Sequence, residues 1–171
     1  MNDRRMTEET GMERICIYPG SFDPITVGHM DIIRRACRIF DRVIVAVLHN
    51  PAKHGTFRLD KRLELIRTAC ADLPTVSVDS FDGLLVDYVR KTGAQVVVRG
   101  LRAVTDFEAE FQMAQVNHQV LSDMETLFMM TQPEHAYISS SVVRELAMFG
   151  GDITPFVPAE IVDEVRSHFA K

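Results

Sequence analysis

The chain has 171 residues, of which 46% are hydrophobic and 25% charged, and its formal net charge is -5 at pH 7. This is the composition of an ordinary globular domain with a sizeable core, which argues against a disordered or fibrous chain. No apolar run approaches the roughly 18 residues of a membrane span and no block of Lys and Arg stands out, so we expect a cytoplasmic protein with no membrane or nucleic acid as partner.

Residues 1–13 are expected to form a flexible N-terminal extension ahead of a single domain at residues 14–171. The opening sequence MNDRRMTEETG is polar and lacks the apolar region of a secretory signal, and Met12 is an alternative start of the fold. The cysteines are odd in number, show no CxxC spacing and fall in apolar patterns, which predicts buried reduced thiols. They are Cys16, Cys37 and Cys70.

Strand and helix patterns alternate along the rest of the chain. Continuous apolar runs with β-branched residues predict five strands, at Arg14–Tyr18, Val43–Leu48, Val76–Val78, Val96–Val98 and Thr126–Met130. Helices are predicted at Gly28–Phe40, Asp60–Ala71, Leu84–Lys91, Asp106–Leu121 and Ser139–Phe149, and from Pro158 to about Ala170. The fourth helix carries an apolar stripe of the kind that packs on a sheet, formed by Phe107, Phe111, Ala114, His118 and Leu121.

This alternation predicts an α/β fold, a Rossmann-like, doubly wound, parallel five-stranded sheet with helices on both faces. In such sheets ligands bind outside the carboxyl ends of the strands, where the strand order reverses. Three loops follow strands directly and are therefore expected on one ligand-binding rim: Pro19–Thr26, His49–Phe57 and Arg99–Thr105.

The segment YPGSFDPITVGH, residues 18–29, carries the strongest functional signal. Pro19 and Gly20 are expected to break the strand, and Thr26 is a predicted N-cap that places His29 in the first turn of a helix. Free N–H groups at a helix start favour an anion, and the imidazole adds a donor. A capping or surface histidine is the alternative, but the spacing to the preceding loop favours a phosphate site.

A second segment, ISSSVVR at Ile138–Arg144, places three serines at a predicted helix start, with Arg144 one turn further on. Hydroxyls and free N–H groups in that position suit a phosphate chain. Plain N-capping by Ser139 or Ser140 is the alternative if the segment is taken alone.

Cations on the predicted rim form the third signal. Arg99 and Arg102 flank Gly100 at the end of a strand, and the guanidinium fork matches phosphate oxygens. Lys53 follows the second strand in a similar way. A solvated loop is the alternative for both groups.

Together these pieces resemble the phosphopantetheine adenylyltransferases, nucleotidyltransferases of coenzyme A biosynthesis, from about Arg14 to the C-terminus. The resemblance rests on Gly20–Pro24 with Thr26–His29, on Arg99–Arg102 followed by Asp106–Glu108 and Glu110, and on Ile138–Ser141. It implies transfer of the adenylyl group of ATP to the 4′-phosphate of phosphopantetheine, which gives dephospho-coenzyme A and pyrophosphate.

The resemblance also implies roles for individual residues. His29 would stabilise charge in the transition state, and Ser21, a threonine in much of the family, would meet both substrates. Lys53 and Arg102 complete the implied catalytic set. The implied ATP-binding residues are Ser21, Phe22, His29, Gly100, Leu101, Arg102, Glu110, His135, Ala136, Tyr137, Ile138, Ser139, Ser140 and Ser141. The implied phosphopantetheine-binding residues are Ser21, Lys53, Leu85 and Arg99.

These motifs contain no Cys-His or Ser-His-Asp arrangement, and the substrate phosphate is itself a nucleophile, so we expect alignment and charge stabilisation by the protein. Mg²⁺ is expected to arrive with ATP and to take no ligand from protein side chains. The resemblance implies a homohexamer.

Two rival functions remain at this point. A nicotinate mononucleotide adenylyltransferase shares a similar first motif, but it usually has a histidine where Thr26 stands. A non-catalytic ATP-binding regulatory module would need neither His29 nor cations for a second substrate.

Overall fold

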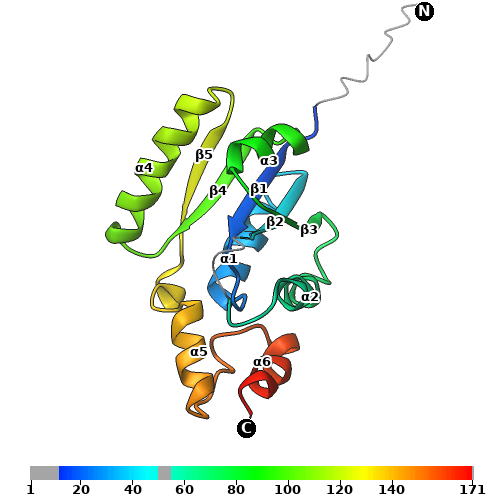
Figure 1. Cartoon of the computed structure of the whole chain (residues 1–171), viewed down its shortest axis with the longest axis vertical. Helices are drawn as coiled ribbons and strands as arrows, with labels where there is room; N and C mark the ends of the chain where they lie inside the picture. The colour runs from blue at the N-terminus through cyan, green and yellow to red at the C-terminus, as the bar shows by residue number, and fades with distance from the viewer. Residues whose placement is uncertain (1–11, 50–54, 171) are drawn as a thin grey trace, which may run out of the picture.

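Five parallel strands form one sheet in the computed structural model, which describes residues 12–49 and 55–170 (Figure 1). The strands lie in the order β3-β2-β1-β4-β5. Their bounds are β1 Ile15–Gly20, β2 Arg42–Leu48, β3 Val76–Phe81, β4 Val96–Leu101 and β5 Glu125–Met130. The predicted α/β fold with a five-stranded parallel sheet is confirmed.

Helices follow the strands in the alternation that the sequence predicts. The α-helices are α1 Val27–Ala36, α2 Leu59–Ala69, α3 Leu85–Thr92, α4 Val104–Val120, α5 Ser140–Met148 and α6 Val162–Phe169. Two short 3₁₀ turns, η1 Pro133–His135 and η2 Ala159–Ile161, precede α5 and α6. In Figure 1 the chain ends with α5 and α6 below the sheet, and α4 runs along its β4-β5 edge.

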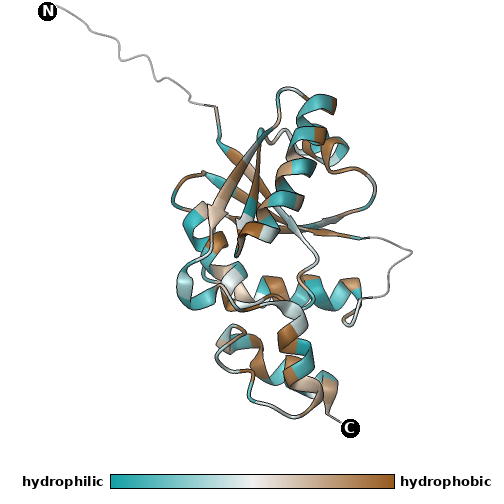
Figure 2. Cartoon of the chain, turned by 90° about the vertical axis from the view of Figure 1, so that its left-hand side faces the viewer, coloured by the Kyte–Doolittle hydropathy of each residue, from teal (hydrophilic) through white to brown (hydrophobic). Residues whose placement is uncertain are grey.

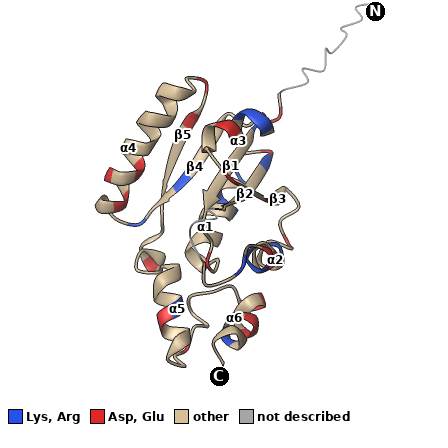
Figure 3. Ribbon diagram, viewed as in Figure 1, with Lys and Arg blue, Asp and Glu red and all other residues tan. Residues whose placement is uncertain are grey.

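The sheet has an apolar core on each face. Alternate residues of a strand point to opposite faces, so Cys16 and Tyr18 of β1 join a cluster with α1, α2, α5 and α6, whereas Ile17 joins one with α3. Figure 2 shows the central strands in brown, and Figure 3 shows the charged residues mainly on the helices and at strand ends. Burial on both faces explains why the strand sequences are continuously apolar.

The strand order reverses between β1 and β4, since β2 and β3 extend from one side of β1 and β5 from the side of β4. The two strands pair only at Cys16 with Val96 and at Ile17 with Val97, and they diverge beyond that point. Their carboxyl ends therefore leave a crevice at the place where doubly wound sheets bind ligands.

Pro19 and Gly20 do not break the strand, so that expectation is wrong. β1 continues through both residues, which pair with Ala46 and Val47 of β2. Proline is tolerated there because the pairing of β1 with β4 has already ended, so its missing N–H removes no bond on that side.

Other predicted boundaries differ by a few residues. β3 and β4 are longer than predicted because their last residues still pair with neighbouring strands, Phe81 with Leu48 and Leu101 with Met130. α1 ends at Ala36 rather than Phe40. The last helix begins after η2, so Pro158 flanks a 3₁₀ turn instead of opening the α-helix.

The apolar stripe of α4 packs on the sheet less closely than predicted. Leu121, the residue after α4, packs against the core cluster around Ile17, but α4 itself has no buried residue. Phe107 lies 5.6 Å from Phe128 of β5, measured between ring centroids, but 40% of its surface stays exposed. Phe111 is 46% exposed. Figure 2 shows brown segments recurring along α4, which faces the viewer.

Two other predictions concern cysteines and the chain start. Cys16 and Cys70 are free and buried as predicted, whereas Cys37 is free but only partly buried. Most of the predicted extension 1–13, and Lys53, lie outside the described residues. Every helix within 12–49 and 55–170 is too short or too polar to cross a membrane.

Candidate active site

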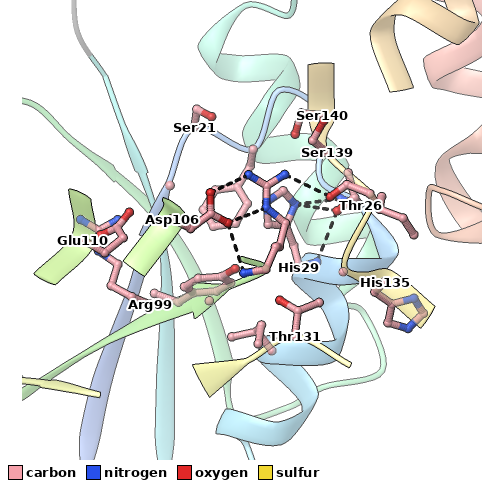
Figure 4. A pocket seen from close by; sticks show the side chains of 18 of the residues that line it. Ser21, Thr26, His29, Arg99, Asp106, Glu110, Thr131, His135, Ser139 and Ser140 are labelled. Carbon is pink, nitrogen blue, oxygen red and sulfur yellow. Dashed lines mark hydrogen bonds and ion pairs between the residues drawn. The ribbon is translucent and has the colours of Figure 1, made fainter. Parts of the chain in front are cut away.

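A cavity of about 490 Å³ lies in the crevice at the carboxyl ends of β1 and β4 (Figure 4). Its wall combines the loop after β1, the first turn of α1, the end of β4 with the start of α4, and the segment from η1 into α5. The predicted phosphate motifs, which are far apart in the sequence, thus meet at one place.

His29 is held in the cavity wall by Thr26, the N-cap of α1. The Thr26 backbone N–H donates to Nδ1 of His29 at 3.0 Å, and the His29 backbone N–H donates to the Thr26 hydroxyl at 3.3 Å. This is a capping box in which a histidine takes the place that Glu or Gln usually has. Because Nδ1 accepts a hydrogen bond, the ring proton of the neutral imidazole belongs on Nε2.

The imidazole is neutral at physiological pH. Burial, with a smaller contribution from the positive charge of Arg102, lowers the pKa of His29 to about 4. His29 therefore acts near pH 7 as a fixed neutral N–H donor and carries no positive charge of its own.

Two aromatic rings pack next to the imidazole. The Phe22 ring meets it edge to face at 5.0 Å between centroids, and Tyr18 meets Phe22 in the same way at 5.4 Å. Phe22 has a φ of 44°, a left-handed conformation that costs a non-glycine residue about 1–3 kcal/mol. A Cβ at Gly20 would lie 3.0 Å from the Phe22 ring, so glycine is needed for this packing.

Two carboxylates of α4 hold the arginines of β4 and of the loop after it. The Nε of Arg99 lies 3.1 Å from Glu110, and the Nε of Arg102 lies 3.0 Å from Asp106. Arg99 also donates to the Pro19 carbonyl at 3.3 Å. The polar side of α4 therefore fixes two guanidinium groups against the cavity.

The serines of the ISSS segment serve both structure and cavity. The Ser139 side chain caps α5 by accepting from the N–H of Val142 at 3.2 Å, as the capping alternative expects. Ser140 donates to the Pro24 carbonyl at 2.8 Å and so joins α5 to the loop after β1. Both residues also line the cavity, together with Ser141.

A second cavity, of about 430 Å³, adjoins the first at the end of β1 and the start of the loop after it. It shares four lining residues with the first cavity: Pro19, Gly20, Ser21 and Arg99. Its remaining wall includes the apolar side chains of Leu48, Phe81 and Leu85. Two cavities of different polarity thus share one wall, the partition formed by the four shared residues.

Most predicted site residues line one of these cavities. The first cavity contains Ser21, Phe22, His29, Arg99, Gly100, Arg102, Glu110, His135, Ile138, Ser139, Ser140 and Ser141, and the second contains Leu85. Leu101, Ala136 and Tyr137 line neither cavity. Lys53 lies in the segment that the structure does not describe.

Two charged residues that line the second cavity were given no role from the sequence, although Asp23 lies within the Gly20–Pro24 motif. Asp23 is 8% exposed, and its carboxylate accepts the N–H groups of Thr56 at 2.9 Å and Phe57 at 2.8 Å. Arg62 of α2 is 7% exposed and donates to the Ser21 carbonyl at 3.0 Å. An arginine in a helical pattern indicates an exposed surface, so the sequence carries no signal for Arg62.

Replacing Thr26 with alanine is expected to lower stability by about 1 kcal/mol, the usual cost of a lost N-cap. We expect kcat to fall by less than about tenfold, because the Thr26 backbone N–H still holds Nδ1 of His29. Urea denaturation and steady-state kinetics measure the two effects, with Thr26→Ser as the control that keeps the hydroxyl. A much larger fall in kcat would mean that the hydroxyl, and not the backbone, orients the ring.

Comparison with known proteins first defines the class. A family model described as cytidylyltransferase-like matches residues 17–146, so the chain belongs to this group of nucleotidyltransferases. Solved structures agree on the fold. A putative nicotinate-nucleotide adenylyltransferase from Vibrio parahaemolyticus has a TM-score of 0.67 at 17% identity, covering 94% of this chain and 98% of that one.

Relatives of higher sequence identity show to which family within this class the chain belongs. The phosphopantetheine adenylyltransferase of Syntrophotalea carbinolica is 57% identical over 157 residues, 92% of this chain and 95% of that protein. The protein of the same name from Caldanaerobacter subterraneus is 51% identical over 158 residues, 92% of this chain and 99% of that protein. The chain belongs to the phosphopantetheine adenylyltransferase family.

Proposed function

We propose that this protein transfers the adenylyl group of ATP to the 4′-phosphate of phosphopantetheine, giving dephospho-coenzyme A and pyrophosphate. The observation that carries the proposal is the pair of cavities that meet at Ser21 and Arg99, since a reaction between two phosphorylated substrates needs two binding sites with a common wall. The more polar cavity, which contains His29 and the ISSS serines, suits ATP. The cavity with Leu48, Phe81 and Leu85 suits the pantetheine arm.

In the proposed reaction an oxygen of the 4′-phosphate attacks the α-phosphorus of ATP. The new P–O bond forms as the bond from the α-phosphorus to the bridging oxygen of pyrophosphate breaks, and no covalent bond to the protein is required. The Nε2–H of His29 donates to an oxygen on which negative charge builds up, and Arg102 adds positive charge nearby. The role of the protein is alignment and charge stabilisation.

Mg²⁺ is proposed to enter with ATP. Within the described residues no group of three or more His, Cys, Asp or Glu is placed to hold a metal ion. The carboxylates of Asp106 and Glu110 in the first cavity are paired with arginines. An ion held by triphosphate oxygens and water fits this donor set, and it would neutralise charge on the leaving pyrophosphate.

A pyrophosphate-release assay tests the proposed function. We expect release with ATP plus phosphopantetheine, and none above background with ATP plus nicotinate mononucleotide or with ATP alone. Release with nicotinate mononucleotide instead would assign the chain to that activity. ATP binding without release in any mixture would favour the regulatory module.

We further propose that the chain acts in the cytoplasm as a homohexamer. The support for assembly is the apolar surface of α4, which stays exposed in the described chain because none of the residues of this helix is buried. The larger exposed hydrophobic residues of this helix are Val104, Phe107, Phe111, Met113, Val116 and Val120. Burying such a surface between copies would provide the packing that the apolar stripe predicts.

Replacing Phe111 with glutamate is expected to shift the protein from a hexamer to smaller species, because a carboxylate in an apolar interface is costly to desolvate. Sedimentation velocity measures the change. Gln112→Glu adds the same group to an exposed position of the same helix and serves as the matched control. An unchanged sedimentation coefficient for the Phe111 variant would mean that this part of α4 is not an interface.

A further inference from the structure

Arg62 is a buried cation in the wall of the second cavity. It belongs to α2, its residue surface is 7% exposed, and it lines the cavity beside Ser21 and Gly55. One guanidinium nitrogen donates to the Ser21 carbonyl at 3.0 Å. Its Nε is buried and has no hydrogen-bond partner among the described residues.

No carboxylate of the described residues lies within ion-pair distance, 4.0 Å, of the Arg62 guanidinium. The acidic residue on the same wall is Asp23. Its carboxylate already accepts two backbone N–H groups, from Thr56 and Phe57, and lies 3.8 Å from Arg144. The positive charge of Arg62 is therefore left without a counter-ion of its own.

A buried charge without a partner is unfavourable, and a guanidinium cannot relieve the cost by losing its proton. The other arginine of this cavity, Arg99, is paired with Glu110 at 3.1 Å. Arg62 thus supplies the excess positive charge among the described residues of this wall. An anion that enters the cavity would supply the missing counter-charge in a region of low dielectric, where attraction is stronger than in water.

We propose that Arg62 confers preference for a phosphate monoester in the second cavity, through its uncompensated charge, while its bond to the Ser21 carbonyl holds the loop between the two cavities. The proposal rests on the proposed function, in which this cavity binds phosphopantetheine. Arg62 acts here as a binding and positioning residue. It is not assigned a part in the chemical step.

Isothermal titration calorimetry with two ligands separates an effect of the Arg62 charge on phosphate binding from an effect of Arg62 on packing. The ligands are phosphopantetheine and pantetheine, which lacks the phosphate. We expect Arg62→Met to weaken phosphopantetheine binding by about tenfold and pantetheine binding by less than about twofold. Arg62→Lys keeps the charge and is expected to bind phosphopantetheine within about threefold of the original protein.

Arg58→Met is the matched control, since Arg58 precedes α2 and its side chain is 89% exposed. It removes the same charge from the surface and is expected to change neither affinity. ATP affinity and melting temperature report whether the fold and the first cavity are intact. If Arg62→Met does not fold, Arg62→Gln, which keeps a donor for the Ser21 carbonyl, replaces it in the same comparison.

Equal weakening of both ligands would overturn the proposal and leave Arg62 with a purely structural role. Unchanged phosphopantetheine affinity in the uncharged variant would also overturn it. These outcomes differ from failure of the proposed function, in which the unsubstituted protein would neither bind phosphopantetheine nor release pyrophosphate with it.

Discussion

Replacing His29 with alanine is expected to lower kcat by a factor on the order of 100 or more, with little change in the KM for ATP. The imidazole is fixed by the Thr26 N–H at Nδ1 and lines the cavity, so the orientation of its Nε2–H is set before substrates bind. A fixed donor of this kind is worth about 3–4 kcal/mol in the transition state and much less in the ground state. Steady-state kinetics with both substrates varied measures the effect.

His29→Gln is the control for this experiment, because glutamine can form the usual capping box with Thr26 and its amide can donate a hydrogen bond, but it lacks the imidazole ring. We expect it to recover part of the lost turnover. Near-normal kcat in the alanine variant would remove His29 from the mechanism. A large rise in KM at constant kcat would instead make His29 a ground-state binding residue.

The low pKa of His29 gives a further expected result. The pKa is about 4 in the folded chain and near 6.5 when unfolded, so the unfolded state binds more protons between these values. The contribution of the neutral imidazole to the free energy of unfolding is complete above pH 6.5 and is lost as the pH falls toward 4. Between pH 7 and pH 4.5 the unsubstituted protein should therefore lose more stability than the His29→Ala variant does, as measured by urea denaturation. Equal losses would contradict the low pKa.

Replacing Arg99 with alanine is expected to lower kcat/KM for phosphopantetheine by about 30- to 100-fold. Arg99 lines both cavities and is paired with Glu110, so its removal takes away a phosphate-binding fork and leaves the Glu110 carboxylate of the first cavity without its cationic partner. The greater part of the loss should appear in KM. Initial-rate kinetics at saturating ATP measures it.

The unpaired carboxylate can be tested separately. Adding Glu110→Gln to the Arg99→Ala variant is expected to recover several-fold of the loss, because it removes the repulsion without restoring the guanidinium. Arg99→Lys keeps the charge but not the forked guanidinium. Its kcat/KM for phosphopantetheine should lie between those of the unsubstituted protein and Arg99→Ala. If the double variant is no better than the single one, repulsion by Glu110 plays no part.

The fold was predictable because local and global signals agree. Strands such as Val43–Leu48 are continuously apolar since both faces of the sheet are covered, and this same burial gives the pattern in the sequence. Pro19 was misleading because proline usually ends a strand, and only the early divergence of β4 from β1 permits it here. That divergence is a tertiary property with no local signal.

The site was predictable where backbone chemistry dictates the residue types, as at Thr26 and His29, whose capping box is visible as sequence spacing. Arg62 was not, because its burial depends on tertiary contacts with Gly55 and with the loop after β1, which lies about 40 residues away along the chain. The stripe of α4 was correctly seen as apolar, but most of it stays exposed in the folded chain. Periodicity identifies a face that needs covering and cannot say which surface covers it.

The partition between the two cavities has a stereochemical consequence. It consists of the short run Pro19, Gly20 and Ser21 with the Arg99 side chain, so in the proposed reaction the attacking phosphate and ATP meet across these residues. An oxygen that attacks from the second cavity and a pyrophosphate that leaves into the first would stand at opposite apices of the α-phosphorus. That arrangement is in-line displacement, in which the configuration at phosphorus is inverted in a single step.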